Sequence, residues 1–458
     1  MRPAGKGDFT LMKLNNKRTV LVGLAFLSIC AFWQMYDNVV PLILTKTFHL
    51  NETFSGAIMA ADNILALFLL PFFGTLSDRT DTKLGKRTPY ILGGTLAAVI
   101  LLNILPLLDN SYYAAASTGK MVAFIVVLGL LLISMGTYRS PAVALMPDVT
   151  PKPLRSRANA IINLMGAVGG IIYLAIAAVM YPNSKVLGLD HVNYQPLFIV
   201  VALIMAVSII VMKLTINEPK LAAENRTLEA EHPEWNLAKD DGSGNEVLPA
   251  NVKRSLGFLL ASIALWFIGY NGITTWFTTY VDKVMGQGLG GASTCLLIAT
   301  GGAIISYIPI GSLAHKIGRK KTIMIGIILL ASCFLAGYFL TTAFSSINAI
   351  MFVVFALVGF AWAAINVNSL PMVVEMCKGS DIGKFTGYYY TASMAAQVVT
   401  PILAGFLMRT ISYKVLFPYA ALFVIFSFVT MTQVKHGDAA PEVKHGLEAY
   451  EDMEDLNE

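Results

Sequence analysis

Long apolar stretches alternate with short polar segments from residue 20 to residue 434. Most of these stretches reach the length of about 20 residues that a helix needs to cross a bilayer. The pattern predicts spans at 20–45, 53–75, 89–108, 120–146, 157–180, 195–216, 255–281, 291–314, 321–342, 347–376, 384–408 and 413–434. A longer polar segment, residues 217–253, divides them six and six. We therefore predict an all-α membrane protein with about twelve transmembrane helices in two six-helix bundles.

The spans also divide the chain into regions. These are an N-terminal segment at 1–19, a first bundle at 20–216, a central linker at 217–253, a second bundle at 254–434 and a tail at 435–458. Lysines and arginines gather in the segments on one side of the spans, and such residues favour the cytoplasmic side. We therefore expect both termini and the linker in the cytoplasm. We also expect an integral protein of the cell membrane that is a monomer.

Composition supports a membrane protein and excludes other classes. Of 458 residues, 56% are hydrophobic and 13% are charged, which is far less charge than soluble domains carry. The net charge of +5 then reflects the orientation in the bilayer and not a nucleic-acid partner. The four cysteines form no Cys-x-x-Cys pair, so no metal or disulfide framework is expected. Phosphate-loop and other enzyme motifs are missing, so we expect neither an enzyme nor a cofactor.

A charged loop follows the second span and recurs in the second half. It reads Gly-x-Leu-x-Asp-Arg at 74–79 and Gly-Lys-Arg at 85–87, and a shorter copy places Gly-x-Leu at 311–313 and Gly-Arg-Lys at 318–320. This repetition predicts a duplicated protein whose bundles move against each other. A loop that only fixes the topology is the alternative. The predicted gating residues are Gly74, Asp78, Arg79, Gly85, Arg87, Asp148, Arg157, Gly318 and Arg319.

The same loop resembles the loop signature of the major facilitator superfamily. Its continuation at 87–90 and the stretch 137–160 resemble the sucrose/proton symporter branch and the related glycoside-pentoside-hexuronide cation symporters. The resemblance implies two pseudo-symmetric bundles and transport of a sugar with a cation. Two departures weaken the match to sucrose: Leu132 stands where those symporters carry a coupling acid, and Val143 stands where they carry an arginine.

Most charged residues lie at the ends of the predicted spans, but three lie well inside them, where each costs about 3 kcal/mol on insertion scales. Asp37 and Asp62 lie at similar depth on consecutive helices, and Arg139 lies about 10 Å deeper along the membrane normal. Low dielectric and mutual repulsion favour the protonated form of at least one acid. We predict that Asp37 and Asp62 couple transport to a cation, H⁺ or Na⁺. A structural salt bridge is the alternative, and no resting pair with Arg139 is assumed.

Aromatic and amide residues recur at helical spacing within several spans. Aromatic rings can stack on the C–H faces of a sugar, while amides and acids hydrogen-bond its hydroxyls. Amides that join helices and rings that face lipid are the alternative. The predicted substrate-binding residues are Gln34, Asp37, Arg139, Asn163, Tyr270, Asn271, Trp362, Asn366 and Gln397.

These features predict a secondary active transporter that moves a sugar or a glycoside with a cation, H⁺ being the first choice. An uncoupled facilitator, or an exporter of amphipathic molecules, is the second hypothesis. A transporter-like sensor that signals through the central linker is the third hypothesis. It ranks last because that linker is short and featureless in sequence.

Overall fold

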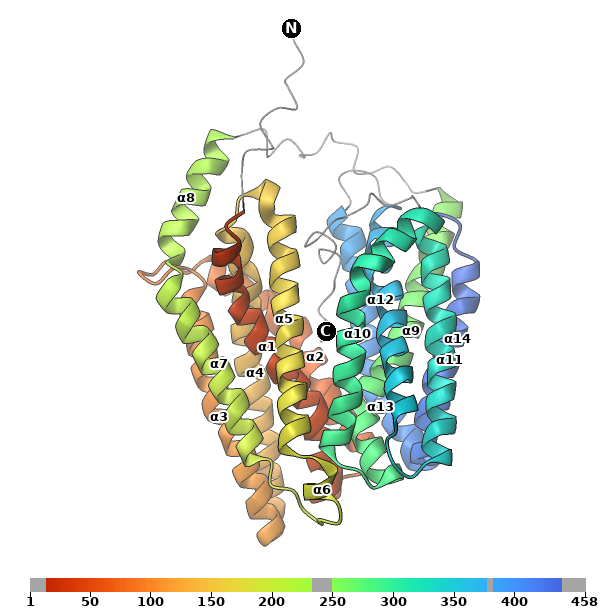
Figure 1. Ribbon diagram of the computed structural model, residues 1–458. Coiled ribbons are helices and arrows are strands. Elements are labelled where there is room, and N and C mark those ends of the chain that lie inside the picture. Colours follow the sequence, from red (N-terminus) through yellow and green to blue (C-terminus); the bar gives the residue numbers. More distant parts are fainter. Residues whose placement is uncertain (1–13, 233–248, 377–381, 439–458) are drawn as a thin grey trace.

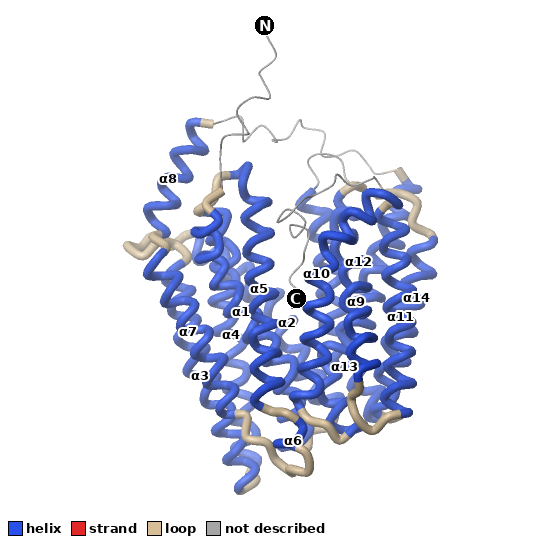
Figure 2. The backbone as a smooth tube through the Cα atoms, in the orientation of Figure 1, coloured by secondary structure: helices blue, strands red, loops and turns tan. Residues whose placement is uncertain are grey.

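The computed structural model describes residues 14–232, 249–376 and 382–438. The described part is helical and contains no strand (Figure 2). Parts of the predicted N-terminal segment, linker and tail lie outside the described residues. Twelve described helices are long and apolar enough to cross a membrane, which confirms the predicted fold class.

The spanning helices of the first half are α1 (Asn16–Leu42, continued by the π-helical turn η1, Ile43–Thr47), α2 (Glu52–Asp78), α3 (Thr88–Ala114), α4 (Thr118–Asp148), α5 (Arg155–Met180) and α7 (Gln195–Thr215). Those of the second half are α9 (Ala250–Met285), α10 (Leu289–Ile317), α11 (Arg319–Ala343), α12 (Ala349–Val374), α13 (Ile382–Thr410) and α14 (Leu416–Thr432). Several run past the predicted ends, because hydropathy marks only the part of a helix that lies in hydrocarbon.

The two bundles stand side by side, with the short helix α6 (Asn183–Val186) at one end and α8 (Glu218–Glu231) at the other (Figure 1). We call these the α6 end and the α8 end. The charged loop after α2 lies at the α8 end. Helix α8 falls within the predicted linker.

Polar contacts join the two bundles towards the α6 end. Lys46 Nζ lies 2.8 Å from Asp282 Oδ1, and Thr278 Oγ1 donates to Asn38 Oδ1 at 2.8 Å. The Tyr413 hydroxyl donates to the Glu52 carboxylate. Each contact pairs a residue of the first half with one of the second, so the α6 end is closed.

Glycines allow the backbones of α2 and α13 to touch at this closure. A Cβ on Gly56 would lie 2.2 Å from the carbonyl oxygen of Pro401, and one on Gly405 would lie 2.3 Å from that of Glu52. Such distances exclude any side chain, so only glycine permits this close approach.

Candidate functional site

A cavity lies between the bundles, and both contribute to its walls. Nine of the ten residues predicted for coupling or substrate binding line it: Gln34, Asp37, Asp62, Arg139, Tyr270, Asn271, Trp362, Asn366 and Gln397. The tenth, Asn163, is buried in α5 and does not line this cavity. Helices far apart in the chain therefore bring the predicted polar and aromatic positions to one place.

The wall from the first bundle carries the charges. Asn63 Nδ2 donates to Asp62 Oδ1 at 2.9 Å. The guanidinium carbon of Arg139 lies 6.0 Å from the centroid of the Trp33 ring, within the range of a cation–π interaction, and Arg139 also interacts electrostatically with Asp62. The depth difference estimated from sequence therefore does not keep Arg139 away from the acid. This wall combines two carboxyls with one fixed positive charge.

The wall from the second bundle is aromatic and amide-rich. The rings of Tyr270 and Trp362 stack with centroids 3.7 Å apart and planes 5° apart. Trp362 Nε1, Asn271 Nδ2 and Asn366 Oδ1 are buried without a hydrogen-bond partner among the described residues. Buried polar atoms are normally paired, and an unpaired one costs about 1–3 kcal/mol. These atoms are therefore suited to bind the hydroxyls of a ligand.

Sequence reasoning missed Trp33 and Phe267 in the lining. Trp33 stands one helical turn before Asp37, so the i, i+4 spacing could have placed it on the same face. It follows Phe32 in an apolar run, and such a tryptophan looks like a residue that faces lipid. Phe267 packs edge-on against Trp362, with centroids 5.3 Å apart.

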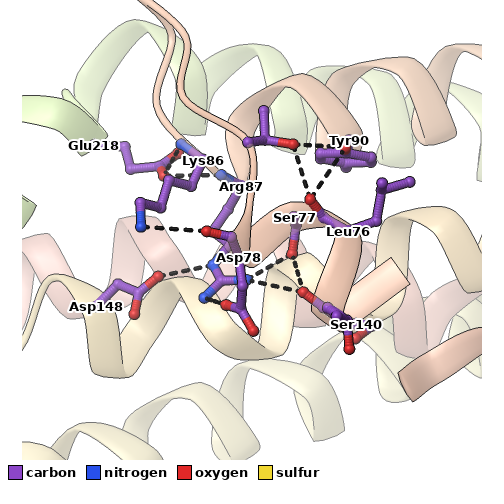
Figure 3. A network of polar contacts seen from close by, with 12 residues as sticks. Leu76, Ser77, Asp78, Lys86, Arg87, Tyr90, Ser140, Asp148 and Glu218 are labelled. Atoms are coloured by element: carbon purple, nitrogen blue, oxygen red, sulfur yellow. Dashed lines mark hydrogen bonds and ion pairs between the residues drawn. The ribbon is translucent and has the colours of Figure 1, made fainter. Parts of the chain in front are cut away.

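A second polar cluster lies at the α8 end and is centred on Arg87 (Figure 3). Arg87 Nε donates to Asp148 Oδ2 at 2.7 Å, Nη1 donates to Ser77 Oγ at 2.5 Å, and Nη2 binds the Asp78 carboxylate. Burial opposes the charge of Arg87, but its bonds to Asp148 and Asp78 outweigh burial and raise its pKa. One guanidinium thereby ties the ends of α2 and α4 to the start of α3.

Glu218 completes this cluster, and sequence reasoning missed it. The side chain is 2% exposed. Its carboxylate accepts from the backbone N–H groups of Lys86, Arg87 and Thr88 at 2.6, 2.8 and 2.8 Å. A negative charge at a helix N-terminus satisfies N–H groups that have no partner within the helix. The signal in the sequence was an acid between a helix-capping asparagine and a proline, directly after the sixth span.

Gly85 is required by this arrangement. Its φ is 109°, and a Cβ on it would lie 2.3 Å from the Glu218 carboxyl carbon. The backbone of the loop can therefore approach the acid only at a glycine.

The second half repeats the arrangement. Gly318 has φ 93°, and Asp438 Oδ1 accepts from the backbone N–H of Lys320 at 2.9 Å. Arg319 binds Glu375, which follows α12 directly. The other predicted gating residues also lie at the α8 end: a Cβ on Gly74 would lie 3.0 Å from Ser140 Oγ, Arg79 lines a surface pocket beside α8, and Arg157 lies in the first turn of α5.

The family model described as Major Facilitator Superfamily matches residues 22–308 and 288–448. The sucrose transport protein SUC3 of Arabidopsis thaliana is 32% identical over 145 residues, which cover 29% of this chain and 24% of that protein. The sucrose transport protein SUT3 of Oryza sativa subsp. japonica is 31% identical over 121 residues, 24% of either chain. The match thus spans about a quarter of these relatives.

Solved structures share the fold over nearly the whole chain. A mutant of the nucleoside transporter NupG has a TM-score of 0.66 at 13% identity and covers 91% of this chain and 100% of its own. The inward open xylose transporter XylE from E. coli has a TM-score of 0.62 at 14% identity, and the match covers 90% of this chain and 94% of that one. An inward-facing bacterial homologue of the iron transporter ferroportin has a TM-score of 0.64 at 12% identity, and the match covers 92% of this chain and 99% of that one.

The structural likenesses establish the fold alone, whereas the family model covers most of the sequence. Together with the plant relatives, it confirms the predicted family resemblance. The chain is a transporter-type integral membrane protein, and it belongs to the major facilitator superfamily.

Proposed function

We propose that the protein is a secondary transporter, and not an enzyme, that carries a sugar or a glycoside together with H⁺. The cavity between the bundles carries this proposal, because its two walls have complementary chemistry. Stacked rings and amides on one wall suit the C–H faces and hydroxyls of a sugar. Carboxyls on the other wall suit a hydroxyl or a cation. The sucrose transport named for the plant relatives supports the same class of substrate.

Asp62 is the proposed coupling group, and Asp37 contributes to the sugar site. Asp62 has a hydrogen bond from Asn63 and lies near the positive charge of Arg139. The guanidinium charge of Arg139 opposes the binding of either cation at Asp62. A proton needs the carboxyl alone, whereas a sodium ion needs several oxygen ligands around it, so H⁺ is the proposed coupling ion.

The proposed cycle is alternating access by two bundles, 20–216 and 254–434, joined by the linker 217–253. The basic segments favour an orientation with the α8 end and both termini in the cytoplasm. The closed α6 end would then face outwards, and this arrangement would be inward-facing. The Arg87 cluster and its repeat at Arg319 are the proposed cytoplasmic gating elements. The functional unit is proposed to be a monomer in the cell membrane.

Counterflow of labelled sugars in proteoliposomes tests the proposal. We expect exchange for at least one mono- or disaccharide or glycoside, and accumulation when a pH gradient is imposed. Exchange without accumulation would support the uncoupled facilitator. Failure of every saccharide to exchange, with protein that is folded and reconstituted, would refute sugar transport and leave the exporter of amphipathic molecules and the sensor as hypotheses.

A further inference from the structure

A buried acid outside the cavity has no assigned role. Asp109 lies near the end of α3 at the α6 end and is 0% exposed. Its neighbours are the Thr47 hydroxyl and the His191 ring, whose Nε2 lies 3.8 Å from Asp109 Oδ2. Neither carboxylate oxygen reaches hydrogen-bond geometry with a described residue. An ionised carboxylate in such a place is costly, so Asp109 holds a proton while it remains buried.

His191 covers this acid and is well placed as a neutral ring. Nε2 lies 2.9 Å from Asn110 Oδ1, Nδ1 lies 3.4 Å from Thr47 Oγ1, and the ring stacks on Tyr113 at 4.4 Å. A neutral imidazole that donates from Nε2 and accepts at Nδ1 satisfies both contacts. Burial, and then the charge of Lys46, lower the pKa of His191. The proton of this pair therefore resides on Asp109.

Other charged or titratable groups surround the pair. Lys46 on η1 is bound to Asp282 of α9. Lys120 on α4 donates to the carbonyl oxygens of Ser111 and Ala115, at the end of α3. Tyr194 lies within electrostatic range of Asp109 and Asp282, and its pKa is raised mainly by burial, so it stays neutral.

The segment that carries His191 also holds the second bundle. Residues 181–194 connect α5 to α7. The carbonyl oxygen of Tyr181 accepts from the Gly290 N–H of α10 at 3.1 Å, and a Cβ on Gly288 would lie 2.5 Å from Val186. Thr47 and Lys46 are neighbours on η1. The cover over Asp109 is therefore continuous with contacts that close the α6 end.

We propose that Asp109 is a proton-binding site whose occupation permits the segment 181–194 to close over it and so shuts the α6 end. When the segment is lifted, Asp109 is hydrated and loses its proton at neutral pH, and closure takes one up again. If the α6 end faces outwards, as in the proposed function, a proton from outside must bind Asp109 before the outward-facing carrier can close.

The direction of the pH dependence follows from the number of protons that the Asp109–His191 pair holds in the closed and in the open arrangement. The closed pair holds one proton, on Asp109. The open pair holds one on His191 below about pH 6.5 and none above it. Closure is therefore independent of pH between about 4 and 6.5. Above about pH 6.5 it weakens by up to about tenfold per pH unit, until Asp109 loses its proton in the closed form as well. Replacing His191 by glutamine removes the proton that the open form holds on His191. The pH dependence of closure should then begin near about pH 4, the ordinary pKa of an aspartate side chain.

Distances between spin labels test this without substrate or membrane orientation. Leu187 and Ile411 are 64% and 66% exposed, on opposite bundles at the α6 end. Labels at these positions, in a variant without native cysteines and reconstituted in nanodiscs, report the ratio of closed to open protein from pH 5 to 8.5. We expect the wild-type dependence derived above, and a range extended to lower pH in His191→Gln. In Asp109→Asn the loss of closure above about pH 6.5 should disappear, and closure should instead weaken below about pH 6.5, where only the open form holds a proton, on His191.

Asp190→Asn is the matched control, since Asp190 is an exposed acid beside His191, and it should respond like the wild type. Asp109→Ser provides a second neutral variant, so that the result does not depend on one substitution folding. A wild type without a pH response, or an Asp109→Asn response equal to that of the wild type, would overturn the proposal. Neither result bears on sugar transport, and a failed counterflow assay would leave this site intact.

Discussion

Removing the ion pair between Lys46 and Asp282 should open the α6 end. The two side chains are 25% and 13% exposed and lie 2.8 Å apart across the bundles. Exposed pairs contribute about 0.2–1 kcal/mol, and loss of one partner of a buried pair costs about 3–5 kcal/mol. This pair lies between those limits, so we expect Lys46→Ala to shift the equilibrium by about 1–2 kcal/mol, or roughly 5–30-fold towards opening.

The labels at 187 and 411 measure this shift directly. Asp282→Ala should have a similar effect, and the double variant should add little, because the two substitutions remove the same interaction. The exchanged pair, Lys46→Asp with Asp282→Lys, should restore closure in part. Strictly additive single effects, or an exchanged pair as open as the double alanine variant, would show that the pair does not hold the bundles together.

Three further predictions concern the cavity and the α8 end. Asp62→Asn should abolish accumulation driven by a pH gradient but spare counterflow, which needs no net proton movement; full accumulation would move the coupling role to Asp37. Asn366→Ala should weaken sugar binding by about 0.5–1.5 kcal/mol, a few-fold to about tenfold in Kd, measured by a thermal-shift titration; an unchanged affinity would argue against contact with the sugar. Glu218→Gln keeps the shape but loses the charge that caps α3, so it should slow net transport more than it weakens binding; equal effects on both would contradict a gating role.

Hydropathy and spacing predicted most of the fold and of the cavity lining. A span must be apolar over a length set by the bilayer, so its presence is visible in any single sequence. A polar residue inside such a span is costly, so Asp37, Asp62 and Arg139 stood out. The amides of the second bundle stood out for the same reason. Asn163 was equally visible, yet the sequence does not reveal that it lies outside this cavity.

Features that depend on tertiary contact escaped prediction. Glu218 looks like any acid after a span, and only the fold brings it to the start of α3. Asp109 was placed beyond the third span, which was predicted to end at residue 108, because polar residues there hide the continuation of α3 to Ala114. Trp33 cannot be told from a residue that faces lipid until the position of the other bundle is known.

Glu218 and Asp438 follow the last membrane-spanning helix of their halves, and they bear on how the chain can be divided into two polypeptides. Each acid binds the third helix of its own half, so each half carries its own closing residue at the α8 end. A gene split at codons for residues 232–249 would give two polypeptides with both acids in place, and these should reassemble when made together. A split before residue 218 would move Glu218 onto the wrong polypeptide and leave the start of α3 uncapped. The first half of this protein therefore ends, as a unit of assembly, beyond its last membrane span.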